Sequence, residues 1–196
     1  FVVDNSCSMS EEQSSLAVNF ASFMQIIEAL DMDYHLGVVD TDTSHSGHLE
    51  GTVPIITPST PDPSGSFSTN VNLGVSGSGI EQGFHTAYLA LSSPNTDPGG
   101  FNYGFLREEA GLRIIFLSDE AEQSSGIMGW SANDYISFFQ GIKVNPDHVV
   151  LSDITGGMTG CNGAGGNADP AVDYVLGTNL TGGISASICD ASWVQT

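Results

Sequence analysis

The segment Phe1-Val2-Val3-Asp4-Asn5-Ser6-Cys7-Ser8-Met9-Ser10-Glu11-Glu12 decides the expected fold, because the end of a strand and the start of a helix meet within it. Its apolar, β-branched beginning is typical of a buried strand. Asp4, Ser6 and Ser8 follow at two-residue spacing on the turn that leaves this strand. One carboxylate and two hydroxyls at this spacing can converge on one point, and such hard oxygen ligands suit Mg²⁺, Mn²⁺ or Ca²⁺. The segment therefore predicts a divalent-metal site at the carboxyl end of a strand.

Helical and strand patterns alternate along the rest of the chain. Ser10 and Gln13 have the spacing of a capping box, and apolar residues recur at helical spacing behind them. Strands are expected at residues 34–39, 52–56, 112–117 and 148–151, and helices at residues 11–31, 79–91, 131–142 and 170–176. This alternation predicts an α/β fold with a doubly wound, mostly parallel central sheet and helices on both faces, similar to a Rossmann fold.

Length and composition bound the architecture and the partners. The 196 residues, 40% of them hydrophobic, are enough for one sizeable core, so residues 1–196 are expected to form a single domain. The chain looks like a fragment that lacks the start of its first strand and the end of a last helix near residues 188–194. Its 3 Lys+Arg against 23 Asp+Glu give a net charge of −20. Such a surface excludes nucleic acid as a partner, and the chain has no apolar run long enough for membrane insertion.

Three cysteines are too few for a disulfide scaffold. Cys161 and Cys189 both lie in the glycine-rich last third of the chain, where a bridge between them would restrain a long loop. Cys7 would remain free inside the proposed metal site. A bridge and an acidic, lysine-poor composition favour a secreted protein at the cell surface or in the periplasm.

Two further segments carry polar residues at the end of a strand or the start of a helix, as the segment of residues 1–12 does. Gly77-Ser78-Gly79 is a flexible turn before the expected helix of residues 79–91, and Asp119 directly follows the strongest strand pattern, residues 112–117. In an open α/β sheet, ligands bind at the carboxyl ends of strands and near helix N-termini. Taken singly, these are ordinary cap and turn residues. Their matching positions favour a shared site.

These three segments resemble the loops of a von Willebrand factor A (vWA) domain. The matching residues are Asp4-Asn5-Ser6-Cys7-Ser8-Met9, then a hydroxyl residue that opens a mid-chain helix, and Leu117-Ser118-Asp119. The chain is most similar to bacterial surface members of this family, and the resemblance covers almost all of it. It implies a metal-ion-dependent adhesion site in which Asp4, Ser6 and Ser8 supply the first motif and Asp119 the third.

The chain departs from the family pattern in its second motif and at Cys7. The family usually has threonine in the second motif, where this chain offers only serines. Ser78 is preferred as the ligand, with Ser76 as the alternative. Cys7 stands where glycine is common, and a thiol is not a suitable ligand for a hard cation. Glu81 and Glu120 are interpreted either as residues that hold coordinating waters or as acidic residues at helix N-termini.

A separate segment, outside the three loops above, resembles the nucleophile motif of an enzyme. Asp40 and Asp42 follow an apolar strand in the pattern Asp-x-Asp-x-Thr, like the nucleophile motif of haloacid-dehalogenase-type phosphatases. That chemistry also requires a nearby lysine and a later acidic pair. Lys143 is the only lysine, and no such pair follows it. His45 and His48 have a spacing found in zinc sites but no further ligands nearby.

The function expected from the sequence is non-enzymatic. It is an extracellular adhesion or protein-binding module that holds one divalent cation, with Mg²⁺ expected before Mn²⁺ or Ca²⁺. Asp4 and Asp119 would hold the ion, Asp119 partly through water, and Ser6, Ser8 and Ser78 would add neutral oxygens. An acidic side chain of a protein partner would complete the coordination. The alternatives are a structural subunit of a surface fibre or layer, assembled from copies of itself, and a phosphatase.

Overall fold

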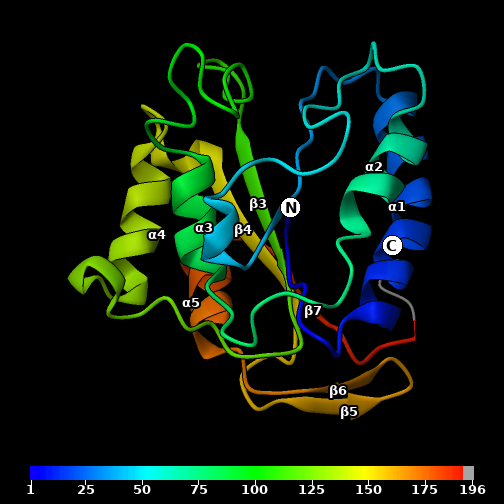
Figure 1. The fold of residues 1–196 in the computed structure, drawn as a ribbon, viewed down its shortest axis with the longest axis vertical. Coiled ribbons are helices and arrows are strands. Elements are labelled where there is room, and N and C mark those ends of the chain that lie inside the picture. The colour runs from blue at the N-terminus through cyan, green and yellow to red at the C-terminus, as the bar shows by residue number, and fades with distance from the viewer. Residues whose placement is uncertain (192–196) are drawn as a thin grey trace.

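The fold is built on a five-stranded parallel sheet (Figure 1). The structure, a computed structural model, describes residues 1–191, except for the side chains of residues 21, 22 and 28. The strands, in the order in which they lie side by side, are β2 (Val39–Asp40), β1 (Val2–Val3), β3 (Leu112–Leu117), β4 (Val149–Thr155) and β7 (Ser185–Ser187). The first strand lies inside the sheet, since Val2 is paired with both Val39 and Phe116. All carboxyl ends therefore meet at one edge.

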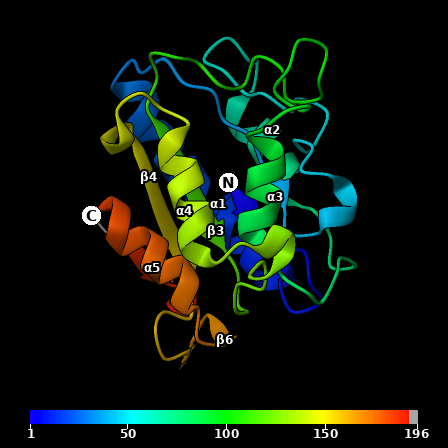
Figure 2. The same ribbon diagram turned by 90° about the vertical axis from the view of Figure 1, so that its left-hand side faces the viewer.

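Helices cover both faces of this sheet. Helices α1 (Ser10–Ala29) and α2 (Pro63–Val71) lie on one face, and α3 (Gly83–Ala90), α4 (Ala132–Gly141) and α5 (Val172–Thr181) lie on the other (Figures 1 and 2). A short antiparallel pair, β5 (Cys161–Gly163) and β6 (Gly166–Ala168), lies beyond the carboxyl ends of the strands. The expected α/β class, parallel sheet and two helical layers are confirmed, and the architecture is compatible with a Rossmann-like fold.

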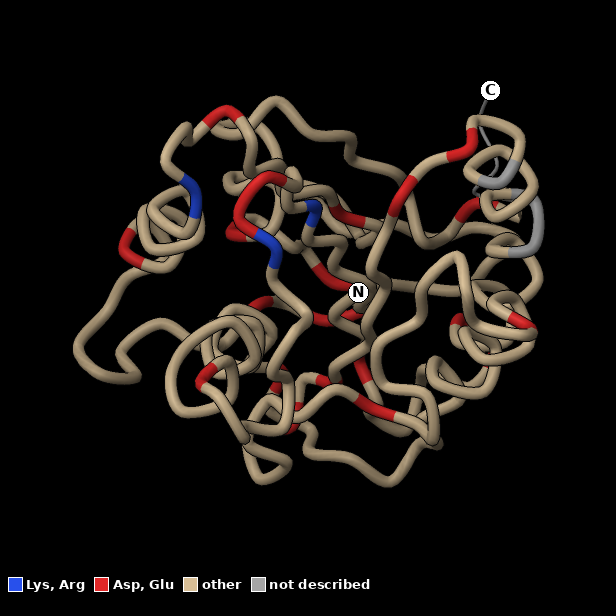
Figure 3. Tube along the Cα trace, turned by 90° about the horizontal axis from the view of Figure 1, so that it is seen from above, with Lys and Arg blue, Asp and Glu red and all other residues tan. Residues whose placement is uncertain are grey.

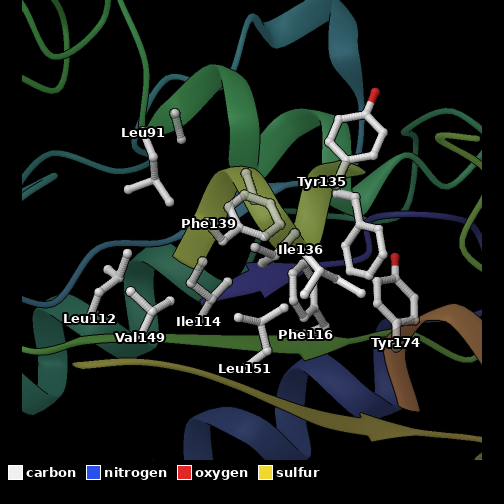
Figure 4. Close-up of a cluster of buried hydrophobic side chains, with 14 of the residues drawn as sticks. Leu91, Leu112, Ile114, Phe116, Tyr135, Ile136, Phe139, Val149, Leu151 and Tyr174 are labelled. Atoms are coloured by element: carbon white, nitrogen blue, oxygen red, sulfur yellow. The ribbon is translucent and has the colours of Figure 1, made fainter. Parts of the chain in front are cut away.

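The two faces of the sheet bury two separate hydrophobic clusters. Successive strand residues point to opposite faces, so Val2 packs with α3, α4 and α5, whereas Val3 packs with α1 and α2. The first cluster is rich in aromatic rings, among them Phe116, Tyr135 and Tyr174 (Figure 4). Phe84 lies edge-on to both Phe116 and Tyr174, with ring centroids 5.2 and 5.4 Å apart. This packing fixes the start of α3 relative to β3, and both elements lead into the proposed site.

Local signals predicted some elements closely and others poorly. β3 has the expected bounds, and Ser131 and Asp134 form the capping box of α4. The strand expected at 34–39 is reduced to β2 and an isolated bridge between Leu36 and Ile56, so the separate strand at 52–56 was wrong. In residues 43–78, where no helix was expected, the structure has α2, with Asp62 as its N-cap.

The C-terminal third also differs from the expectation. α3 begins at Gly83 rather than residue 79, and α5 begins at Val172, with Ala171 as N-cap, rather than at residue 170. β5, β6 and β7 were not predicted, because they are short and lack an apolar alternation. The helix expected near residues 188–194 is a turn and a bend up to Ala191, and its remainder lies outside the described residues.

A disulfide joins Cys161 and Cys189, a pairing that the sequence had left open, and Cys7 is a free, exposed thiol. The bridge connects β5 to the segment that follows β7. Among the residues that the structure describes, no helix combines the length and the apolarity needed to cross a membrane.

Candidate metal centre

The first loop folds around Asp4, which is fully buried at the carboxyl end of β1. Its backbone N–H donates to the Leu117 carbonyl of β3, so the strand pairing continues through this residue. One carboxylate oxygen of Asp4 accepts from the Ser6 backbone N–H at 2.7 Å, which closes the turn. The Ser6 and Ser8 hydroxyls are hydrogen-bonded to each other at 3.2 Å. The two-residue spacing thus brings these side chains together, as the sequence predicts.

The second loop is held against the first by main-chain contacts. The Gly77 N–H donates to the Asn5 carbonyl at 2.9 Å. A Cβ on Gly77 would lie 2.1 Å from the Asn5 side chain, so only glycine fits this approach. The side-chain amide of Gln13, in the first turn of α1, donates to the carbonyls of Asp4 and Gly74 at 2.9 and 3.0 Å. Gln13, expected in a capping box with the helix start, therefore joins two loops.

Ser78 and Glu81 occupy different places in this second loop. The Ser78 hydroxyl accepts from the Ile80 N–H, and the Ser78 N–H donates to a carboxylate oxygen of Asp42. Glu81 is fully buried, and after burial itself the nearby Asp4 charge raises the pKa of its carboxyl group. The Thr41 hydroxyl donates to Oε2 of Glu81. The second-loop side chain that lies near Asp4 is thus a carboxylate, which sequence reasoning had not placed among the ligands.

The third loop adds Asp119 and Ser118 after β3. The Ser118 hydroxyl donates to the second carboxylate oxygen of Asp4 at 2.7 Å. The Ser8 hydroxyl lies near the Asp119 carboxylate and opposes the rise of its pKa, and the Asp119 carbonyl accepts from the Asp169 N–H at 2.8 Å. Asp4, Ser6, Ser8 and Asp119 therefore lie together at this edge of the sheet. We call these four residues and Glu81 the carboxylate cluster.

The carboxylate cluster has buried carboxyl oxygens that no neighbouring group satisfies. Glu81 Oε1 and Asp119 Oδ1 are buried without a hydrogen-bond partner, and so is Oε2 of the neighbouring Glu12. Burial, then the Asp4 charge, raises the pKa of Glu81 to about 8, and burial also raises the pKa of Asp119. Buried carboxylates normally have a paired cation.

No basic side chain supplies that cation. The chain has only three Lys and Arg residues, and each contacts another region: Arg107 pairs with Asp33, Arg113 donates to the carbonyls of Leu112 and His148, and Lys143 donates to the carbonyl of Arg107. The buried, unpartnered carboxylate oxygens and nearby hydroxyls fit a hard divalent cation.

Asp40, His45 and Glu50 lie elsewhere on this edge. Among the described residues they are the one group of three or more His, Cys, Asp or Glu whose ligand atoms all lie within 4.8 Å of one another. Here the Asp40 carboxylate is well satisfied. It pairs with the His45 ring and accepts from the Asn5 side-chain amide at 3.2 Å and from the Asp42 N–H. Since the Asp40 pair raises the pKa of His45, a protonated imidazole can balance this group without a metal. His48, by contrast, is stacked on Phe101.

Comparison with known proteins gives no functional information. No protein-family model and no curated protein matches the chain. Among solved structures, the chain is similar to an uncharacterized membrane-spanning protein from Vibrio fischeri, at 17% identity over 97% of this chain and 90% of that one, with a TM-score of 0.28. A similarity at that level carries no argument about fold or function.

Proposed function

We propose that this chain is an extracellular, non-enzymatic adhesion or protein-binding module that uses a divalent cation, in a doubly wound fold of the vWA type. One observation carries the proposal: the carboxylate cluster joins three loops at the carboxyl edge of the sheet and leaves buried carboxylate oxygens unpartnered. The disulfide between Cys161 and Cys189 supports an oxidising compartment.

The residues have distinct parts in this proposal. Asp4 and Asp119 would hold the ion as charged ligands, with Ser6 and Ser8 as neutral ones. Ser118 donates to Asp4 and thereby fixes the orientation of its carboxylate. Ser78 would become a ligand only if its hydroxyl turned away from the Ile80 N–H, from which it accepts a hydrogen bond. A bound cation would keep an open coordination position, and an acidic side chain of a partner would fill it.

Charge supports a metal as the intermediary between two acidic proteins. A net charge of −20 repels an acidic partner over most of the surface, and the cation provides the local exception. Binding of such a partner should strengthen as salt is raised moderately, because salt screens the long-range repulsion more than the buried contact.

Two alternatives make different predictions. A structural subunit of a fibre or layer would assemble from copies of itself after the metal is removed. A phosphatase that uses Asp40 and Asp42 would lose turnover in the variant Asp40→Asn. The arrangement favours neither, since Asp40 is engaged by Asn5 and His45, and Lys143 donates to the carbonyl of Arg107 instead of approaching Asp40.

Calorimetric titration of chelator-treated protein with Mg²⁺, Mn²⁺ and Ca²⁺ tests the proposal. The wild-type protein should bind one cation saturably, and Asp4→Asn should abolish binding, because the variant loses the central charged ligand. Asp147→Asn is the matched control, since Asp147 is exposed in a distant turn. Absence of binding by the wild-type protein, or equal binding by Asp4→Asn, would contradict the proposal and favour the structural subunit.

A further inference from the structure

The loop that follows β2 returns to the strand and brings three metal-ligand side chains together. Asp40 ends β2, and the chain then turns through the short 3₁₀ helix Thr43–His45. Farther along, the Glu50 N–H donates to the Val38 carbonyl at 2.8 Å, so the loop closes beside the strand. The ligand atoms of Asp40, His45 and Glu50 consequently all lie within 4.8 Å of one another.

The loop is held in this shape by two buried asparagines of another loop. The side-chain amide of Asn95 donates to the Ser46 carbonyl at 2.8 Å. Asn102 donates to the Gly47 carbonyl at 2.8 Å and accepts from the Leu49 N–H at 2.9 Å. These contacts fix the backbone between the second and third ligand residues, so their positions do not depend on a bound ion.

The two carboxylates of this group are partnered differently. The Asp40 carboxylate pairs with the His45 ring, but the half-buried Glu50 carboxylate forms no ion pair among the described residues. Burial, then the Asp40 charge, raises the pKa of Glu50. Two carboxylates and one imidazole thus share a confined space, and a divalent cation is a partner that would satisfy both carboxylates at once.

We propose that Asp40, His45 and Glu50 form a second metal site, which binds Zn²⁺ with three protein ligands and one open position. The ion would take the place of the proton on the imidazole. The spacing of His45 and His48 is typical of zinc sites, but His48 is stacked on Phe101. Asp40 and Glu50 lie beside His45 in its place. The inference does not rest on the proposed function, since none of the three ligands belongs to the carboxylate cluster.

The kinds of ligand favour zinc over the ions expected at the carboxylate cluster. An imidazole suits Zn²⁺, Cu²⁺ or Ni²⁺, whereas Mg²⁺ and Ca²⁺ prefer oxygen ligands. Zinc sites that keep an open position commonly have three protein ligands, with bond lengths of about 2.0–2.2 Å. Tetrahedral geometry then puts the ligand atoms roughly 3.3 Å apart, so atoms within 4.8 Å need to approach by at most about 1.5 Å.

The surroundings of the three side chains permit this adjustment. The His45 side chain is 51% exposed, so its ring can turn without disturbing the core. The Asp40 carboxylate is held by the Asn5 side-chain amide at 3.2 Å and by the Asp42 N–H at 3.1 Å. Hydrogen bonds of this kind orient a ligating carboxylate and support metal affinity.

Titration with Co²⁺, a spectroscopic substitute for Zn²⁺, tests the inference. Tag-free, chelator-treated protein is titrated in excess Mg²⁺, which fills sites made of oxygen and leaves a site with an imidazole open. We expect one Co²⁺ per chain with a visible absorption band, which Zn²⁺ should abolish by displacement. His45→Asn should raise the dissociation constant of Co²⁺ at least ~10-fold, because loss of a ligand costs no less than loss of an outer hydrogen-bond partner.

His48→Asn is the matched control, since His48 lies in the same loop and its ring is stacked on Phe101. It should bind Co²⁺ like wild type. If His45→Asn fails to fold, Glu50→Gln takes its place: it keeps the backbone contact with Val38 and should also weaken Co²⁺ binding at least ~10-fold. Absence of the band in the wild-type protein, or an equal affinity in His45→Asn, would overturn the inference and leave a simple ion pair.

This inference and the proposed function can fail separately. Asp4→Asn should abolish Mg²⁺ binding and leave the Co²⁺ band, whereas His45→Asn should abolish the band and leave Mg²⁺ binding. Loss of both metals in either single variant would contradict the existence of two separate sites.

Discussion

The two ends of the sheet differ in how their charged side chains are partnered. The carboxyl end holds the carboxylate cluster, and the amino end holds all three Lys and Arg side chains of the protein, namely Arg107, Arg113 and Lys143. Figure 3 shows these three residues close together, whereas acidic residues are spread over the whole trace. At the amino end the charges are balanced or exposed, as in the pair of Arg107 with Asp33.

This contrast shows where buried carboxyl oxygens lack a partner within the protein. At the amino end, Lys143 donates to a carbonyl and Arg107 reaches a carboxylate, so the chain satisfies its own charges. At the carboxyl end, Glu81 and Asp119 keep unpartnered oxygens. A lysine beside Glu81 and Asp119 could have satisfied these oxygens, but the chain has none there. A cation bound from solution would explain why they have no partner within the protein.

The largest expected effect comes from the disulfide at the carboxyl end. The double variant Cys161→Ala/Cys189→Ala removes a cross-link that spans 28 residues, which should cost about 3–4 kcal/mol in the free energy of unfolding, measured with urea. Cation affinity should fall as well, because the segment after the β5–β6 pair donates from Asp169 to the carbonyl of Asp119.

Cys7→Ser is the control for that experiment. It removes the free thiol but keeps the bridge, so its stability should stay within about 0.5 kcal/mol of wild type, as for most surface substitutions. If the double variant were as stable as Cys7→Ser, the bridge would not be what holds the carboxyl end together.

A smaller effect is expected from Glu122, a buried carboxyl group behind the carboxylate cluster. Glu122 accepts hydrogen bonds from the backbone N–H groups of Phe84 and Ser124, yet burial raises its pKa from 4.5 to about 7. The folded state therefore binds a proton more tightly than the unfolded state. Stability from this group is full below pH 4.5 and falls as the pH rises toward 7, by about 2–3 kcal/mol.

Glu122→Gln should remove this pH dependence. Relative to wild type, the variant should gain stability between pH 5 and pH 8, as measured by urea unfolding in chelator. Glu109→Gln, at an exposed position, should follow the wild-type curve. A constant difference between Glu122→Gln and wild type across this range would show that Glu122 is ionised throughout.

The smallest effect is expected at the amino end. Arg107→Ala removes a pair whose partner, Asp33, is 80% exposed, so the free energy of unfolding should change by less than about 1 kcal/mol. The cation affinity should stay within about twofold of wild type, because the amino end is remote from the carboxylate cluster. A large loss of cation affinity in this variant would mean that the two ends are coupled, and would remove the contrast between them.

The sequence predicted those parts of the fold that depend on local patterns. β3, the capping box of α4 and the bridge between Cys161 and Cys189 follow from apolar runs, cap residues and cysteine placement. α2 was missed because Ser, Thr and Gly dominate it, although Asp62-Pro63 is a good helix start. β7 was missed because Ser185-Ala186-Ser187 has no strand pattern, and only its pairing with β4 makes it a strand.

The candidate site shows the same limit. Residues that share one turn, such as Asp4, Ser6 and Ser8, could be grouped from their spacing. The places of Ser78 and Glu81 in the second loop could not be predicted, because they depend on how this loop docks on Asn5 and on the contact of Glu81 with Thr41. Both contacts join residues far apart in the sequence, and local patterns carry no information on them.

The exposed thiol of Cys7 makes the carboxylate cluster observable in the natural sequence. Cys7 stands between Ser6 and Ser8, and the other two cysteines are paired with each other. A maleimide fluorophore or spin label would therefore attach at a single position, on the rim of the loop that surrounds Asp4. Occupancy of this loop can thus be followed by spectroscopy in the otherwise unaltered protein.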